Sequence, residues 1–207
     1  MKYIENLDGG NVNYKEEIEI RKAIREKIYD GEKITKEERE WLVTHPVYHE
    51  IMGFPVLRVD VIDIKPNTKY IITIKKHSST YPYKIGAVVS VPASKGKIIL
   101  DKAVFDMYNR EKKPGSPIKS YFTEFETNDE ESFLYMSTIG KIKVDYGCQF
   151  IEKWNNELIY GFADGADRNF AMKKEVVDDN KIIYSCKSVV GDNFDALVFS
   201  LELNEVT

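Results

Sequence analysis

The spacing of apolar residues in the first 50 positions predicts two helices. In the first helix, apolar residues recur at intervals that place their side chains on one face. These residues are Ile20, Ala23, Ile24 and Ile28. Asn13 and Glu16 have the spacing of a capping box at the start of this helix, and Asp30 and Gly31 supply its end.

A second, shorter helix follows after a turn. Thr35 and Glu38 have the spacing of another capping box. Because Pro46 restricts His45 to an extended conformation, this helix is predicted to end near Thr44.

From residue 54 onward the pattern is that of strands. Runs of β-branched and aromatic residues alternate with clusters of Gly, Pro, Asn and Asp at short intervals. About ten strands are expected, at residues 56–64, 70–75, 87–91, 97–100, 121–125, 133–136, 149–154, 158–162, 181–187 and 196–203. Some runs are apolar and others mix apolar with charged residues, which is typical of antiparallel sheets with one solvated face.

The order of these elements predicts an α+β fold. A helical pair at residues 1–50 is expected to pack on a mainly antiparallel β-sandwich at residues 51–207, with jelly-roll or Greek-key-like connections. A chain of 207 residues can bury one such core without a metal or a disulfide.

One segment, residues 64–74, reads Ile-Lys-Pro-Asn-Thr-Lys-Tyr-Ile-Ile-Thr-Ile. It resembles the tyrosine corner of fibronectin type III domains and related Greek-key sandwiches, in which a tyrosine at the start of a strand binds the backbone of the preceding corner. Those domains have several strands before the corner, whereas one is expected here. The resemblance therefore implies the corner geometry for Tyr70, and not the family, its topology or its functions.

Charge and composition narrow the classes of partner. Thirty Lys and Arg against 34 Asp and Glu give a formal net charge of −4, which disfavours nucleic acid and anionic membranes. The amino terminus lacks the apolar stretch of a secretory signal, and no segment approaches the roughly 18 apolar residues of a membrane span. We expect a cytoplasmic protein without membrane contact, unless a signal has been removed. The abundance of Ile, Lys and Asn is typical of a phage or low-GC bacterial source.

The cysteines and histidines predict no metal site. Cys148 and Cys186 lie 38 positions apart without a CxxC motif, so we expect two reduced thiols in strands, or one disulfide if the chain is exported. His45 and His49 have a metal-like spacing, but no third ligand is apparent beyond the adjacent Glu50. A polar connection between helix and strand is the preferred interpretation.

Motifs for catalysis and nucleotide binding are not found. His77 lies beside two serines without a G-x-S-x-G motif, and residues 94–98 lack the glycine pattern of a phosphate loop. The aspartates at 164–167 and 192–195 are interpreted as hairpin turns rather than calcium loops. We expect no cofactor and favour a protein that is not an enzyme, although a pair of glycoside-cleaving carboxylates would leave no sequence signature.

Basic residues on the first helix raise the question of a helix-turn-helix DNA reader. They are Arg21, Lys22, Arg25 and Lys27. Glutamates on the same helix cancel much of this charge, and Glu17 has the i, i+4 spacing of a surface ion pair with Arg21. The helices are therefore interpreted as a flap on the sandwich, and no direct DNA binding is expected.

An acidic run lies at the end of one predicted strand and in the following loop. It consists of Glu124, Glu126, Asp129, Glu130 and Glu131. A solvated sheet edge is the preferred interpretation. The alternative is a mimic of nucleic-acid phosphates that occupies the basic groove of a nucleic-acid enzyme.

Three aromatic residues lie in a predicted loop or at a strand end: Tyr81, Tyr83 and Trp154. Such rings suit protein recognition or stacking on sugars, and a loop folded onto the sheet is equally expected. With the acidic run, they predict a non-catalytic module that binds or inhibits another protein. A carbohydrate-binding module and an acidic nucleic-acid mimic are the alternatives, and an enzyme ranks after a binding module.

Overall fold

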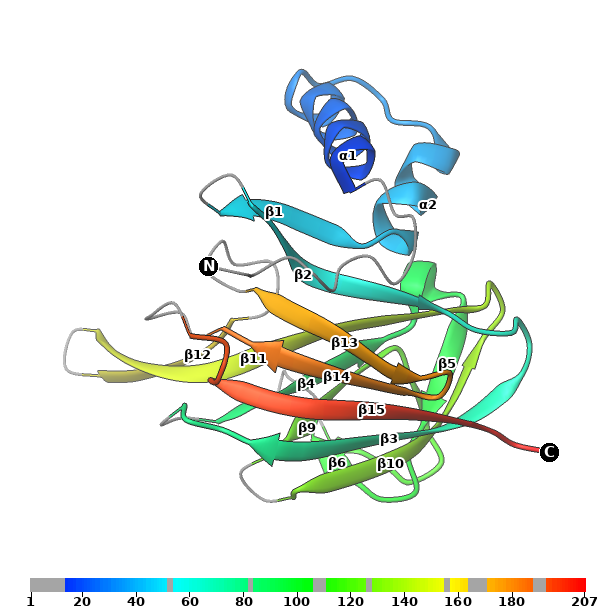
Figure 1. Cartoon of the computed structure of the whole chain (residues 1–207), viewed down its shortest axis with the longest axis vertical. Helices are drawn as coiled ribbons and strands as arrows, with labels where there is room; N and C mark the ends of the chain where they lie inside the picture. The colour runs from blue at the N-terminus through cyan, green and yellow to red at the C-terminus, as the bar shows by residue number, and fades with distance from the viewer. Residues whose placement is uncertain are drawn as a thin grey trace.

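A computed structural model of the chain describes residues 14–51, 54–81, 84–105, 111–125, 128–154, 157–163, 171–187 and 193–207 (Figure 1). The helices are α1 (Tyr14–Tyr29) and α2 (Lys36–Thr44), with a 3-10 turn η1 (Pro92–Ser94). The first strands are β1 (Val47–Ile51), β2 (Phe54–Asp63), β3 (Lys69–Ser78), β4 (Ile85–Ser90), β5 (Gly96–Ile99), β6 (Val104–Phe105), β7 (Glu111–Lys112) and β8 (Pro117–Ile118). They are followed by β9 (Ser120–Glu124), β10 (Glu130–Ser137), β11 (Lys141–Trp154), β12 (Glu157–Ala163), β13 (Met172–Asp178), β14 (Lys181–Cys186) and β15 (Leu197–Glu205).

Helix α2 begins and ends where the sequence predicts. The Thr35 hydroxyl accepts the N–H of Glu38 at 3.1 Å, and the Glu38 carboxylate accepts the N–H of Thr35 at 2.8 Å, so both halves of the capping box form. The helix ends at Thr44, because Pro46 keeps His45 extended. The predicted cap of α1 at residue 13 lies outside the described residues.

Arg21 joins the two helices. It is 8% exposed, and its guanidinium donates to the carbonyl oxygens of Leu42, His45 and Pro46 at 3.0 to 3.1 Å. These carbonyls lie at the carboxyl end of α2, where the helix itself supplies no donors. Glu17 interacts electrostatically with Arg21, as the spacing predicts, but Arg21 is buried against the end of the neighbouring helix and does not lie at the surface.

The apolar face predicted for α1 is only partly covered. Ile24 is buried, whereas Ile20 and Ile28 are 38% and 49% exposed. Helix α1 contacts β1 and α2 contacts η1, so the helical pair lies along one margin of the sheet (Figure 1). Arg21 occupies part of the buried side of α1, where the spacing predicted apolar residues only.

Within the described residues, thirteen strands form one sheet in the order β8-β5-β10-β3-β15-β14-β13-β2-β11-β4-β9, with β1 beside β2 and β12 beside β11. The ladders are antiparallel, and a helical pair precedes them, which confirms the predicted antiparallel sheet and the predicted amino-terminal helices. The end strands β8 and β9 are separated by Lys119 alone. Because of this short connection, the sheet curls until it is nearly closed.

Burial alternates along the strands, as the predicted solvated face requires. In β10, Phe133 and Tyr135 are buried while Leu134 between them is exposed, and in β14 the buried residues are Ile182, Tyr184 and Cys186. The inner faces of the strands form a single aromatic and aliphatic core. The outer face carries the polar residues and remains in contact with solvent.

The predicted tyrosine corner is confirmed. Tyr70, the second residue of β3, is buried in the core, and its hydroxyl accepts the N–H of Lys65 at 3.1 Å. The corner packs on the turn at Gly140, which has a φ of +69° and accepts the N–H of Ile64 at 2.8 Å. A Cβ on Gly140 would lie 2.5 Å from the carbonyl oxygen of Ile64, so glycine permits this close approach.

Six strand segments were not predicted: β1, the two-residue strands β6, β7 and β8, β13, and the first part of β11 at residues 141–148. Strand β13 consists mostly of exposed and charged residues, so its own sequence gives a weak strand signal. It is held by its ladder with β14, which follows after the two residues Asp179 and Asn180.

Candidate functional site

The segments that carry the predicted binding residues meet at one end of the sheet, on the left of Figure 1. Cross-strand pairs place them there: Ser78 with Val198, Ile85 with Cys148, and Gly86 with Glu124. We call this region the loop end, and define it as residues 79–81, 84, 124–125, 128–131 and 193–196. Loops held by a rigid sheet are where binding residues concentrate in folds of this kind.

Tyr81 lies in a loop that is bound to the segment before β15. The backbone N–H and the hydroxyl of Thr80 donate to the carbonyl oxygen of Asp195 at 3.2 and 3.0 Å. The hydroxyl of Ser79 donates to the carbonyl oxygen of Ala196 at 2.7 Å. Tyr81 is half-buried against the core, so its ring is held in place and keeps part of its surface exposed.

Phe194 is a second aromatic residue at the loop end, and the sequence did not single it out. The Nζ of Lys173 lies 4.3 Å from the centroid of its ring, which is within the range of a cation–π interaction. The sequence pattern of residues 192–195 was interpreted only as a hairpin turn with oxygen ligands. Phe194 could have been identified as a candidate binding residue, because it is an aromatic residue within a polar turn, as Tyr81 is an aromatic residue within a predicted loop.

Apart from Glu131, each carboxylate of the acidic run that the structure describes is half-buried or exposed and has a lysine beside it. The pairs are Glu124 with Lys84, Asp129 with Lys76 at 3.4 Å, and Glu130 with Lys75 at 3.8 Å. Glu126 lies outside the described residues. Because the negative charges are balanced locally, this part of the run resembles a charged sheet edge more than an uncompensated acidic surface.

Glu131 differs from the rest of the run because β10 turns it inward. Its side chain is 3% exposed, and its carboxylate accepts from Lys102 at 2.5 Å, Asn128 at 2.7 Å and the Tyr121 hydroxyl at 3.0 Å. Burial, and then the charge of Glu131, raise the pKa of Tyr121. Glu131 therefore links the acidic run to the core, and its charge is shielded from solvent.

Trp154 ends β11, in a hairpin that extends past the loop end. Strand β11 pairs with β4 as far as Cys148 and continues to Trp154 beside β12. The side chain of Trp154 and the whole of Tyr83 lie outside what the structure describes.

A buried ionic group links β2 to β13 and β14. Asp60 is 3% exposed and accepts from the Tyr184 hydroxyl at 2.6 Å, the Lys174 Nζ at 2.8 Å and the Val61 N–H at 2.9 Å. Burial, and then Asp60, raise the pKa of Tyr184 well above its ordinary value. Strand β13 pairs with β2 at one position, so this group reinforces the sheet where its ladder is shortest.

The outer face carries an exposed row of apolar residues away from the loop end. Leu134 on β10 pairs with Ile99 on β5 and with Ile71 on β3. Ile71 and Leu134 are 43% and 38% exposed. We call these three residues the apolar row; Asn204, which pairs with Ile71, continues it onto β15.

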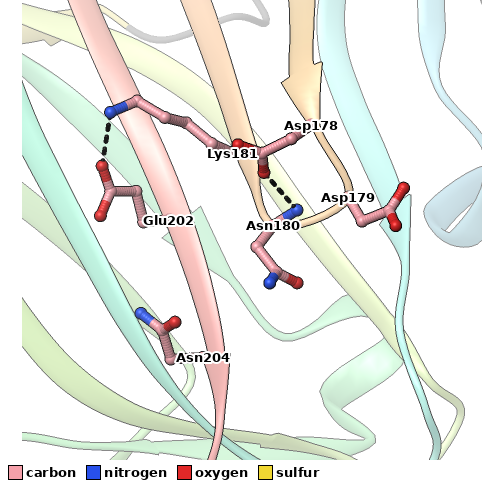
Figure 2. A pocket seen from close by; sticks show the side chains of 6 residues that line it. All are labelled: Asp178, Asp179, Asn180, Lys181, Glu202 and Asn204. Carbon is pink, nitrogen blue, oxygen red and sulfur yellow. Dashed lines mark hydrogen bonds and ion pairs between the residues drawn. The ribbon is translucent and has the colours of Figure 1, made fainter.

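A shallow polar hollow of about 440 Å³ adjoins the apolar row at Asn204 (Figure 2). Its lining residues are Asp178, Asp179, Asn180, Lys181, Glu202 and Asn204. The Nζ of Lys181 is paired with Glu202 at 2.7 Å, and the Asn180 N–H donates to Asp178 at 2.8 Å. The hollow therefore has an excess of negative charge on its β13–β14 side.

The two histidines with a metal-like spacing, His45 and His49, have separate partners. His45 stacks on Trp41 with 4.4 Å between ring centroids, and its Nδ1 lies 3.0 Å from the Trp41 carbonyl oxygen. The Nε2 of His49 faces the guanidinium of Arg58. Within the part of the chain that the structure describes, no three His, Cys, Asp or Glu side chains are grouped to hold a metal ion.

Both cysteines occupy buried strand positions, as predicted. Cys148 and Cys186 are free thiols. Burial raises the pKa of Cys186 well above its ordinary value, which keeps the thiol protonated and weakly nucleophilic.

Among the described residues, neither helix is long and apolar enough to cross a membrane. A comparison with protein family models, curated proteins and solved structures finds no match to this chain. Function is therefore inferred from the described surfaces alone.

Proposed function

We propose that this protein is a non-catalytic module, built on a Greek-key-like or jelly-roll β-sandwich, that binds another protein through its loop end. The supporting observation is that Tyr81 and Phe194, two half-buried rings from separate loops, lie at the same end of the sheet. The hydrogen bonds between Thr80 and Asp195 fix these loops to each other. Aromatic side chains that are already held in place lose little conformational freedom on binding.

The charged pairs at the loop end suit the border of such an interface. Lys84 with Glu124 and Lys76 with Asp129 place charges of both signs at the same end as the rings. Protein interfaces commonly combine an apolar centre with a polar rim, and the rim contributes more to specificity and association rate than to affinity. The predicted residues Tyr83, Trp154 and Glu126 belong to the same proposal.

Binding is preferred to catalysis because two buried carboxylates, those of Asp60 and Glu131, already accept hydrogen bonds within the protein. Asp60 accepts three hydrogen bonds, from Tyr184, Lys174 and Val61. Glu131 likewise has three donors. A glycoside-cleaving pair instead needs two carboxylates that face a sugar from opposite sides.

A carbohydrate-binding module is the second candidate. The polar hollow favours it, because the carboxylates and amides of Asp178, Asp179, Asn180 and Asn204 can bind sugar hydroxyl groups (Figure 2). Mimicry of nucleic-acid phosphates has less support, because Lys75, Lys76 and Lys84 balance the described carboxylates of the acidic run.

Affinity capture with a paired variant tests the proposal. Tyr81→Ala combined with Phe194→Ala is expected to reduce recovery of a captured protein by about ten-fold or more, since truncation of a central aromatic residue commonly costs about 1 to 2 kcal/mol. Tyr29→Ala is the matched control, because Tyr29 is 89% exposed on α1, away from the loop end.

Equal recovery of every captured protein by the wild type and the double variant would contradict binding at the loop end. Glycan-array binding that is lost on Asn180→Ala and Asn204→Ala, with no protein captured, would favour the carbohydrate candidate. Circular dichroism of each variant separates loss of binding from loss of the fold.

A further inference from the structure

The outer face of the sheet carries a row of lysines beside the apolar row. Lys97 on β5 and Lys69 on β3 both pair with Met136 on β10, which faces the same side as Leu134 two residues before it. Lys119 follows β8 directly, opposite Lys97 in the continuation of the ladder between β5 and β8. We call Lys69, Lys97 and Lys119 the basic row.

Neighbouring carboxylates do not balance the charges of the basic row. None of the ion pairs between described residues includes one of these three lysines. On β15, the residues in register with the two rows are Asn204, beside Ile71, and Val206, beside Lys69. The apolar row, the basic row and Val206 therefore form one patch with no carboxylate among them, which we call the basic-apolar patch.

We propose that the basic-apolar patch binds the surface of a bilayer that contains anionic phospholipids. Lysine side chains have long apolar stems and can place their ammonium groups beside lipid phosphates. Ile71, Leu134 and Val206 are 43%, 38% and 41% exposed, so they can enter the boundary between headgroups and acyl chains. Unbalanced positive charge beside exposed apolar side chains is the observation that carries this proposal.

The composition of the patch favours a lipid surface over a protein or a nucleic acid. Protein interfaces are enriched in aromatic residues and arginine and depleted in lysine, whereas this patch consists of aliphatic side chains and lysines. Proteins bind single-stranded nucleic acids largely by stacking the bases on aromatic rings, and the two rows contain none. A bilayer needs only positive charge and apolar side chains on one face.

The position of the charges matters more here than their sum. The net charge of −4 disfavours an anionic surface as a partner, and the sequence alone predicts no membrane contact. At physiological ionic strength, however, charges interact over about 8 Å, so the lysines that touch the bilayer dominate the attraction. Only the ladders show that these lysines lie in one row beside apolar side chains.

The basic-apolar patch and the loop end lie at opposite ends of the strands. Strand β3 begins at Lys69 and ends at Ser78, beside the loop end, and β15 runs from the loop end toward the carboxyl terminus (Figure 1). A chain bound to a bilayer through the patch therefore keeps its loop end accessible. The proposal goes beyond partner binding at the loop end and does not depend on it.

Cosedimentation with vesicles of equal parts phosphatidylcholine and phosphatidylserine, and with vesicles of phosphatidylcholine alone, tests the proposal. The wild type is expected to bind the mixed vesicles more tightly, and to bind them less tightly as salt is added. Each lysine near an anionic surface strengthens binding about five-fold, so Lys69→Ala with Lys97→Ala is expected to weaken binding about 25-fold. Lys22→Ala with Lys33→Ala is the matched control, because it removes the same charge at exposed positions of α1 and the turn after it.

The apolar contribution is tested separately. Ile71→Ser with Leu134→Ser is expected to weaken binding to the mixed vesicles about ten-fold, because these side chains no longer gain from leaving water. Ile28→Ser with Val43→Ser, at exposed apolar residues of α1 and α2, is expected to leave binding unchanged. Circular dichroism of each variant shows that the fold is retained.

A wild-type chain that binds the mixed vesicles no better than phosphatidylcholine alone overturns the proposal. So does binding that withstands Lys69→Ala with Lys97→Ala, or that the control pair of lysines weakens equally. Capture of a single-stranded oligonucleotide or an acidic protein through Lys69 and Lys97, without vesicle binding, would assign the patch to that partner instead. Vesicle binding is expected to persist in the Tyr81→Ala, Phe194→Ala variant, which separates this proposal from partner binding at the loop end.

Discussion

At the scale of single residues, burial decides what each carboxylate does. Asp60→Asn is expected to lower the free energy of unfolding by about 3 kcal/mol, because it leaves Lys174 without its counter-ion. Urea denaturation measures this change. The control is Asp63→Asn, whose side chain is 83% exposed and pairs with Lys141; its expected cost is below about 1 kcal/mol. Equal losses for the two variants would contradict a structural role for Asp60.

Glu17 gives a pH-dependent prediction. Its Oε2 is buried without a hydrogen-bond partner in the described residues, and burial raises the pKa of this carboxyl group despite the nearby Arg21. Because the folded state then binds the proton more tightly than the unfolded state, the contribution of Glu17 to stability falls as pH rises through its pKa.

Glu17→Gln is therefore expected to raise the melting temperature at pH 7, well above the ordinary pKa of a glutamate, and to change it little at pH 3.5, below that pKa. Thermal unfolding of both proteins at the two pH values is the measurement. A glutamine variant that melts below the wild type at pH 7 would show that attraction to Arg21 outweighs burial.

At the scale of elements, Arg21 is predicted to hold the helical pair together. Burial lowers the pKa of Arg21 to about 10, so the guanidinium stays charged at neutral pH. Arg21→Met removes its hydrogen bonds to the end of α2 and is expected to speed amide exchange in α2 by about ten-fold or more, with little effect on β3 and β10. Arg25→Met, at an exposed position of α1, is the control. Unchanged exchange in α2 would refute this role.

The tyrosine corner provides a second test at this scale. Tyr70→Phe removes the acceptor of the Lys65 N–H and is expected to lower the free energy of unfolding by about 1 kcal/mol. Tyr29→Phe should have almost no effect, because Tyr29 is 89% exposed. Denaturation curves that coincide for wild type and Tyr70→Phe would mean that the corner hydrogen bond contributes nothing measurable.

The elements that the sequence predicts are specified by residues a few positions apart, whereas the missed elements are specified by contacts with another element. The capping box of Thr35 and Glu38 and the corner at Tyr70 each depend on residues a few positions apart, so the sequence pattern was sufficient. Strand β13 depends on its ladder with β14. The buried side of α1 depends on the hydrogen bonds that Arg21 donates to carbonyl oxygens at the end of α2. Both features therefore depend on contacts with a neighbouring element, which override the spacing within the element itself.

At the scale of the whole molecule, the sequence predicted candidate binding residues without showing that the segments that carry them meet. Tyr81 and Glu130 come to one end because of the strand order, which no local pattern specifies. Glu131, adjacent to Glu130 in the same acidic run, points into the core because successive residues of a strand face opposite sides. Likewise, the apolar row could not be predicted from the sequence, because only the ladders show that Ile71, Leu134 and Ile99 lie side by side.

Hydrogen exchange of the chain, alone and saturated with a captured partner, tests partner binding most directly. Amides of residues 79–81, 124–125, 128–131 and 193–196 are predicted to exchange more slowly in the complex, while those of the turn at Asp179 and Asn180 remain unchanged. Protection confined to that turn or to the helical pair, with none at the loop end, would contradict the account.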